Sequence, residues 1–110
     1  MELAATPEAR RNGLMHRQAL PPDQGMLLAY PRERVLKMWM LNTFIPLDVG
    51  FFDSGGRLVN RLSMEPDGGR RIYASAAPAR YALEMNRGWF DRHRIAPGAR
   101  LVLPRPVEAR

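Results

Sequence analysis

The feature that most constrains this chain is its most apolar stretch, residues 37–53. Apolar side chains recur there at every second position: Met38, Met40, Val49 and Phe51. A period of two residues is typical of a β-strand, whose side chains point alternately to opposite faces. Asn42-Thr43 and Pro46 interrupt the pattern, because short polar side chains bond their own backbone and proline cannot donate to a strand ladder. We therefore expect two strands joined by a polar corner.

The chain on either side of this stretch predicts further short strands. Asp53-Ser54-Gly55-Gly56 is a strong hairpin signal, and residues 58–64 would form the returning strand. The other strands are expected at residues 1–5, 26–30, 70–73, 80–85 and 100–103. Within the strand at 80–85, the alternation places Tyr81, Leu83 and Met85 on one face and Ala82 and Glu84 on the other.

Two short helices complete the expected elements. Thr6-Pro7-Glu8 is a good helix start, with threonine as the N-cap, proline at the first position and an acid in the first turn. This helix would stop at Gly13, and one further helical turn is expected at residues 89–93. The pattern predicts a mainly β domain, compact and barrel-like or sandwich-like, with one or two short helices. It leaves the strand order open.

Four blocks of residues carry a resemblance to a known family. They are Gly13-Leu14-Met15-His16-Arg17, Asp23-Gln24-Gly25-Met26-Leu27, Trp39-Met40-Leu41-Asn42-Thr43 with Pro46-Leu47-Asp48, and Tyr81-Ala82-Leu83-Glu84-Met85. In this order, spread over residues 2–103, they resemble the domain of unknown function 192 family. That resemblance implies a small, mostly β bacterial or archaeal domain without an assigned activity, often carried behind a secretion signal. Typical members have a lysine where this chain has Leu41, and the loss of that lysine argues against a lysine-dependent mechanism. They also have a late Gly-Asp pair where this chain has Gly98-Ala99.

Length and composition exclude several classes of protein. The 110 residues are enough for one domain, expected at residues 1–103 and followed by a loose tail at 104–110. Without cysteine, a disulfide scaffold, a thiolate metal site and a cysteine nucleophile are all excluded. No apolar run approaches the ~20 residues that span a bilayer. We expect a soluble domain, periplasmic or secreted if a signal peptide has been removed.

The net charge of +6 raises the question of nucleic acid. The arginines are scattered, without a dense run or an aromatic-interleaved stripe, so a basic solvated surface is the favoured interpretation. Nucleic acid is therefore not an expected partner. The oligomeric state is left open by the sequence.

The polar corner and residues from other blocks form the candidate site. We expect a pocket beside residues 39–48 that binds a small polar or anionic ligand, because basic residues outnumber acidic ones. The candidate ligand-binding residues are Trp39, Asn42, Thr43, Asp48 and Ser75. The candidate supporting residues are Arg17, Asp23 and Glu84. The competing interpretation is that Asn42-Thr43 simply makes the corner.

A non-enzymatic binding module is the preferred function, and two alternatives stay open. In the first, the protein is a small hydrolase-like enzyme with Asp48 or Glu84 as general base. Against it stands a structural role, in which Asp48 bonds backbone amides and Glu84 pairs with an arginine such as Arg17. In the second, the protein is an interaction module with an exposed apolar patch near Trp89-Phe90.

Metals and cofactors are not expected. Three methionines, Met15, Met38 and Met40, could together suit Cu(I), but core packing is the favoured role for such adaptable side chains. Two histidines, His16 and His93, are too few for a histidine-rich zinc site. The paired glycines belong to hairpins, so no loop that cradles phosphate is present and no nucleotide cofactor is indicated.

Overall fold

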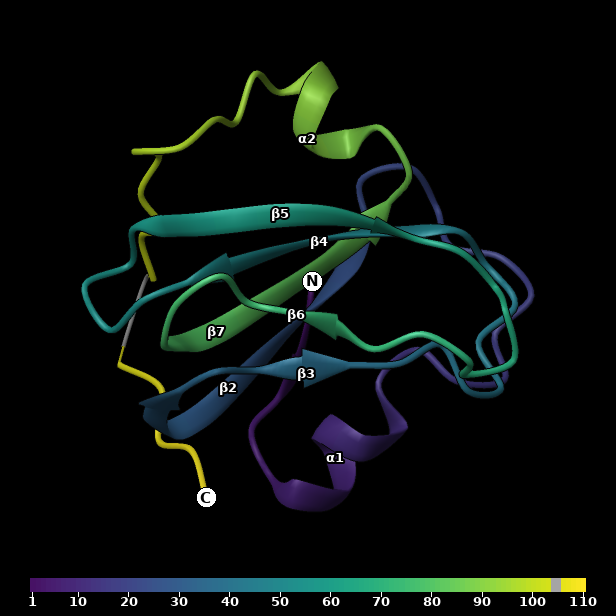
Figure 1. Cartoon of the computed structure of the whole chain (residues 1–110), viewed down its shortest axis with the longest axis horizontal. Helices are drawn as coiled ribbons and strands as arrows, with labels where there is room; N and C mark the ends of the chain where they lie inside the picture. Colours follow the sequence, from purple (N-terminus) through teal and green to yellow (C-terminus); the bar gives the residue numbers. More distant parts are fainter. Residues whose placement is uncertain (104–105) are drawn as a thin grey trace.

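The computed structural model describes residues 1–103 and 106–110, and its main feature is a five-stranded sheet (Figure 1). Across the sheet the strands are β1 (Glu2–Ala4), β2 (Gly25–Arg34), β7 (Ala79–Asn86), β4 (Leu47–Phe52) and β5 (Leu58–Met64). The β1–β2 pair is parallel and the others are antiparallel. A second sheet pairs β3 (Lys37–Met38) with β6 (Tyr73–Ala74). The predicted mainly β domain is confirmed, and the large sheet is open rather than closed into a barrel.

Two apolar clusters cover the two faces of the sheet. The predicted alternation in β7 places Ala82 in the first cluster and Tyr81, Leu83 and Met85 in the second. The first cluster lies under α1 (Pro7–Asn12) and the β3–β6 pair, and the second lies under α2 (Trp89–Arg92) and the chain that follows it (Figure 1). Because both faces are covered, every residue of β4 is buried.

The two short helices form where their end signals predict them. The Thr6 side chain accepts a hydrogen bond from the Ala9 amide at 3.2 Å, and α1 ends at Asn12 with Gly13 as its C-cap, whose φ is +47°. The short α2 is held by Phe90, which is fully buried. A Cβ atom at Gly50 would lie only 2.8 Å from the Phe90 ring, so glycine lets this ring lie directly on β4.

Several element bounds differ from the expectation. Strand β2 continues through Pro31 to Arg34 with an irregularity after Ala29, whereas a strand ending at Tyr30 was predicted. In the apolar stretch, β3 ends at Met38 and no strand re-forms before Leu47, because the polar corner is longer than the alternation suggests. Residue Asn42 turns the chain there with a φ of +50°. The predicted last strand contributes an isolated bridge between Arg100 and Arg57.

The chain end lies against the second cluster. Val107 and Ala109 contact that cluster, and the Arg110 amide donates to the Ala5 carbonyl at 2.9 Å. Residues 104–105 of the predicted tail lie outside the described residues, and the boundary at Leu103 stays a prediction. Within the part of the chain that is described, no helix is long and apolar enough to cross a membrane.

Candidate functional site

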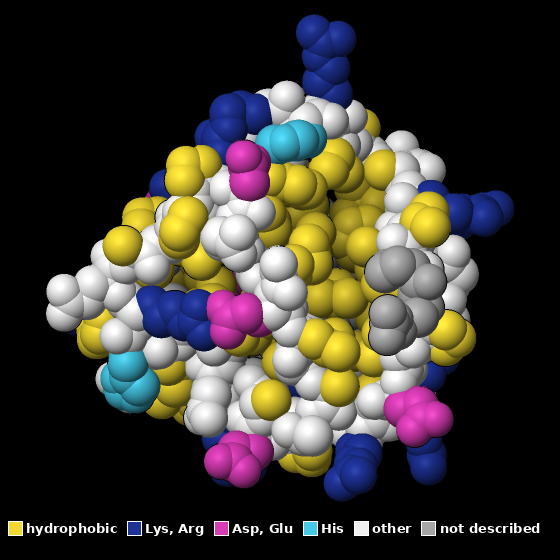
Figure 2. All heavy atoms as spheres, turned by 180° about the vertical axis from the view of Figure 1, so that it is seen from behind, with side chains coloured by type: hydrophobic (Ala, Val, Ile, Leu, Met, Phe, Trp, Pro, Cys, Tyr) yellow, Lys and Arg dark blue, Asp and Glu magenta, His cyan; other side chains and the backbone are white. Residues whose placement is uncertain are grey.

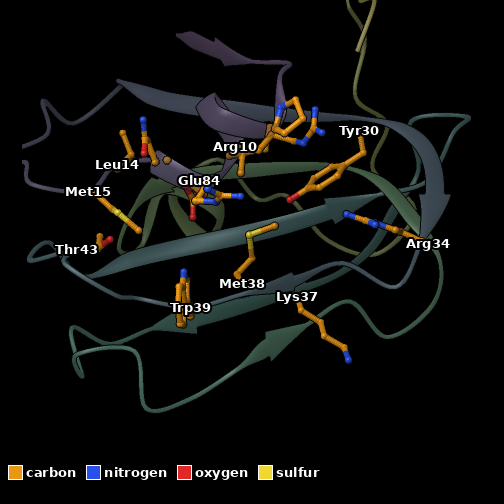
Figure 3. A pocket seen from close by; sticks show the side chains of 15 residues that line it. Arg10, Leu14, Met15, Tyr30, Arg34, Lys37, Met38, Trp39, Thr43 and Glu84 are labelled. Atoms are coloured by element: carbon orange, nitrogen blue, oxygen red, sulfur yellow. The ribbon is translucent and has the colours of Figure 1, made fainter. Parts of the chain in front are cut away.

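A cavity of about 250 Å³ lies between α1 with its following loop, the large sheet and β3 (Figure 3). One part of its lining is basic: Arg10, Arg11, Arg34 and Lys37. Another part is apolar: Leu14, Met15, Leu28, Met38 and Trp39. One carboxyl group, that of Glu84, lines the same cavity. The cavity thus combines charged groups of both signs with an apolar part, and the polar part of the lining is the larger one.

Glu84 reaches the cavity from β7, in the middle of the large sheet. It pairs with Met26 on one side and Val49 on the other, which directs its side chain to the face that α1 covers. The residue is only 6% exposed, and burial raises the pKa of its carboxyl to about 7. No ion pair among the described residues involves Glu84. Near neutral pH this carboxyl can therefore either donate or accept a hydrogen bond.

Two arginines and a tyrosine form the basic end of the cavity. The guanidinium carbons of Arg10 and Arg34 lie 4.8 Å and 5.5 Å from the centre of the Tyr30 ring. Arg10 also donates to the Ala29 carbonyl at 2.9 Å, which fixes its position. Burial raises the pKa of Tyr30, the two arginines oppose that rise and Glu84 adds to it, so all four groups lie within electrostatic reach. In Figure 3 the Tyr30 hydroxyl points toward Glu84, whereas Lys37 points away from the cavity.

Three of the predicted site residues meet at this cavity: Trp39, Thr43 and Glu84. Trp39 is 47% exposed and forms part of the mouth, while the Thr43 hydroxyl donates to the Leu41 carbonyl at 3.1 Å. Asn42 is exposed, and its carbonyl accepts a hydrogen bond from the His16 amide, so it serves the corner.

Ser75 lies outside the cavity lining and joins two elements. Its hydroxyl accepts from the Leu36 amide at 2.9 Å, and its own amide donates to the Leu36 carbonyl. These two bonds extend the pairing of β3 with β6. Arg17 pairs with Glu2, and this hydrogen bond holds the pKa of Glu2 below its usual value. Asp23 is exposed, with its Oδ1 3.9 Å from Nε2 of His93.

Asp48 is buried on the opposite face of the sheet. Its Oδ2 accepts a hydrogen bond from the Gly88 amide at 2.8 Å, at the turn into α2. Its Oδ1 is buried without a hydrogen-bond partner among the described residues, and the nearest charged group is Arg87, with Nε at 3.7 Å. This geometry fits a structural role for Asp48, in which its carboxylate bonds a backbone amide.

Replacing Asp48 by alanine should lower the free energy of unfolding by about 1–3 kcal/mol, because the Gly88 amide loses its acceptor inside the fold. Asparagine keeps an acceptor oxygen and should cost less. Urea unfolding of both variants checks this expectation. Equal losses for the two variants would mean that the carboxylate charge beside Arg87 matters more than the bond to Gly88.

The three methionines considered as metal ligands do not all reach the cavity. Met15 and Met38 line the cavity, while Met40 is fully buried in the first cluster. Among the described residues, no three His, Asp or Glu side chains gather as a metal site.

Phe90 is fully buried and Trp89 partly buried. Figure 2 shows hydrophobic side chains gathered in a hollow on the face opposite to that seen in Figure 1, which carries the second cluster.

Sequence reasoning missed the basic end of the cavity. Tyr30 and Arg34 lie four residues apart, so a strand extended past Pro31 would have indicated that they share a face. Pro31 argued against such a strand, because proline is expected at the end of a strand or in an edge strand of a sheet. The position of Arg10 beside them depends on how α1 packs on the sheet, which the sequence does not reveal.

The sequence and the fold are similar to those of known proteins. A model of the family DUF192, described as "Uncharacterized ACR", matches residues 1–103. A crystal structure of a protein proposed to be a transcription regulator, from Sinorhizobium meliloti 1021, is 38% identical with a TM-score of 0.84, and the match covers 90% of this chain and 77% of that one. A protein of unknown function from Novosphingobium aromaticivorans DSM 12444 is 32% identical with a TM-score of 0.84, covering 90% and 71%. None of the curated proteins matches the sequence.

Proposed function

The chain belongs to the uncharacterised DUF192 family, and we propose that it is a non-enzymatic module that binds a small polar or anionic ligand in the cavity beside Trp39. One observation carries this proposal: a buried carboxyl group, Glu84, lines a cavity of about 250 Å³ with no ion-pair partner among the described residues. A buried polar group normally has a partner, because leaving it unpaired costs stability. A bound ligand would supply that partner.

The basic end of the cavity supports an anionic group on the ligand. Arg10 and Arg34 are held over the same tyrosine ring, so two guanidinium groups are positioned before any ligand arrives. Guanidinium groups bind carboxylate and phosphate through paired hydrogen bonds.

Native mass spectrometry of freshly purified protein tests the proposal. We expect a mass above that of the denatured chain, and we expect it to disappear in Arg10→Ala/Arg34→Ala. The matched control is Arg70→Ala/Arg71→Ala, which removes two positive charges at exposed positions outside the cavity and should keep the extra mass. A bare mass for the wild type, together with no thermal shift by small organic acids, would contradict the proposal.

A second candidate function is catalysis by Glu84. The observation in its favour is the pKa of about 7, which suits a general base at neutral pH. Of the two acids considered for this role, Glu84 faces the cavity and Asp48 lies across the sheet. An activity that follows the titration of one group near pH 7 and is lost in Glu84→Gln would favour the enzyme over the binding module.

A further inference from the structure

Resting on the proposed ligand-binding function, we propose that the ligand is a small amphoteric molecule. Its ammonium group would pair with Glu84 and its anionic group with Arg10 and Arg34. Both ends of such a molecule find a partner in this cavity, and the protein leaves both partners available. The argument for each end rests on a different set of contacts.

At the inner end, Glu84 needs a positive charge that the protein does not provide. Arg17, a candidate partner from the sequence, pairs with Glu2. The Arg10 guanidinium donates to the Ala29 carbonyl and lies over the Tyr30 ring, which leaves other N–H donors free. It forms no ion pair with Glu84. An ionised carboxylate among apolar side chains is costly unless a cation pairs with it. The ammonium group of a ligand is the cation that fits this position.

At the outer end, Arg34 is exposed, and its contact with the Tyr30 ring orients it without neutralising it. No ion pair within residues 1–103 and 106–110 involves Arg34 or Arg10. Both guanidinium groups lie beside the Tyr30 ring and line this end of the cavity. A carboxylate or phosphate group at this end of the cavity can receive paired hydrogen bonds from a guanidinium group.

Between the two ends the lining is apolar, and this limits the middle of the ligand. In Figure 3, Met38 lies between Glu84 and Arg34, while Met15 lies on the other side of Glu84. Such walls favour a short hydrocarbon spacer. A volume of about 250 Å³ is below the ~300–1,000 Å³ of drug-sized pockets, so the ligand is a small metabolite rather than a nucleotide.

Calorimetric titration with matched probes tests the ligand class. The amphoteric probes are glycine, β-alanine, 4-aminobutyrate and 5-aminovalerate, and each is compared with the carboxylate and the amine of the same length. We expect the best amphoteric probe to bind at least ~10-fold more tightly than either single-function partner, because it satisfies both ends at once. Glu84→Gln should remove this advantage, so that the amphoteric probe binds no more tightly than the plain carboxylate.

The pH dependence gives a second readout. The charged or titratable groups that line the cavity with Glu84 are Arg10, Arg11, Tyr30, Arg34 and Lys37. Burial raises the pKa of Glu84 to about 7. An ammonium group needs the ionised carboxylate, so affinity should rise roughly 10-fold from pH 6 to pH 8, with proton release on binding near pH 6. A ligand whose anion contacts protonated Glu84 would instead bind more weakly at pH 8 than at pH 6.

The outcomes separate the two proposals. Equal affinities for the amphoteric probes and the plain carboxylates, unchanged in Glu84→Gln, would overturn the amphoteric class and leave ligand binding intact. Weaker binding at pH 8 than at pH 6 would do the same. If the wild type binds none of the probes, the amphoteric ligand class is rejected, and the native mass then decides whether the binding function stands.

Discussion

The Glu84→Gln variant is expected to be more stable than the wild type at pH 8 by about 3 kcal/mol, and to match its stability near pH 4. Burial raises the pKa of Glu84 from 4.5 to about 7, so the folded state holds this proton over a range where the unfolded state has released it. Wild-type stability is therefore fully present below pH 4.5 and falls as the pH rises through 7. A shift of this size corresponds to about 3 kcal/mol. Glutamine keeps the shape and removes the titration.

Urea unfolding at pH values from 4 to 8 measures this difference directly. The control is Glu65→Gln, the same substitution at an exposed acid that pairs with Arg87 outside the cavity, and its effect on the pH dependence should be small. Parallel stability curves for wild type and Glu84→Gln would mean that Glu84 is not buried unpaired in solution. A stability gain at pH 8 would instead mark Glu84 as a residue kept at a cost, as residues of functional sites often are.

Local patterns predicted the elements better than their arrangement. The Thr6-Pro7 start, the hairpin at residues 53–56 and the two faces of the strand at 80–85 are confirmed. Each of these depends on a few neighbouring residues and on steric rules that apply anywhere. The parallel pairing of β1 with β2 and the central place of β7 depend instead on contacts between distant segments, which leave no local signal.

The register between β4 and β7 explains why only some of the predicted site residues lie together. Asp48 and Glu84 lie on adjacent strands, and the sequence gives no reason to separate them. In the sheet, Glu84 pairs with Val49 and Asp48 pairs with Met85, so the two acids are offset by one residue in the register. Side chains alternate between faces, and a single step therefore puts them on opposite sides. Trp39 and Thr43 reach the cavity because the corner folds over the face that carries Glu84.

The contact between Gly50 and Phe90 should show strong energetic coupling. Phe90→Ala is expected to lower the free energy of unfolding by about 3–5 kcal/mol, because it empties a fully buried position between α2 and the sheet. Gly50→Ala should cost about 1–3 kcal/mol, since its Cβ would lie 2.8 Å from the Phe90 ring. Unfolding by urea measures both losses.

The double variant distinguishes a steric clash from a backbone effect. In Gly50→Ala/Phe90→Ala the new methyl group enters the space that the ring has left, so the second substitution should cost much less than it does in the wild type. Trp89→Ala provides the control, because it removes a partly buried ring from the same helix that is not among the atoms nearest to a Cβ at residue 50. If the costs at Gly50 and Phe90 simply add, then glycine is required at position 50 for a reason other than the approach of Phe90. If the two costs do not add, the close packing of α2 on β4 explains why this strand carries a glycine between Val49 and Phe51.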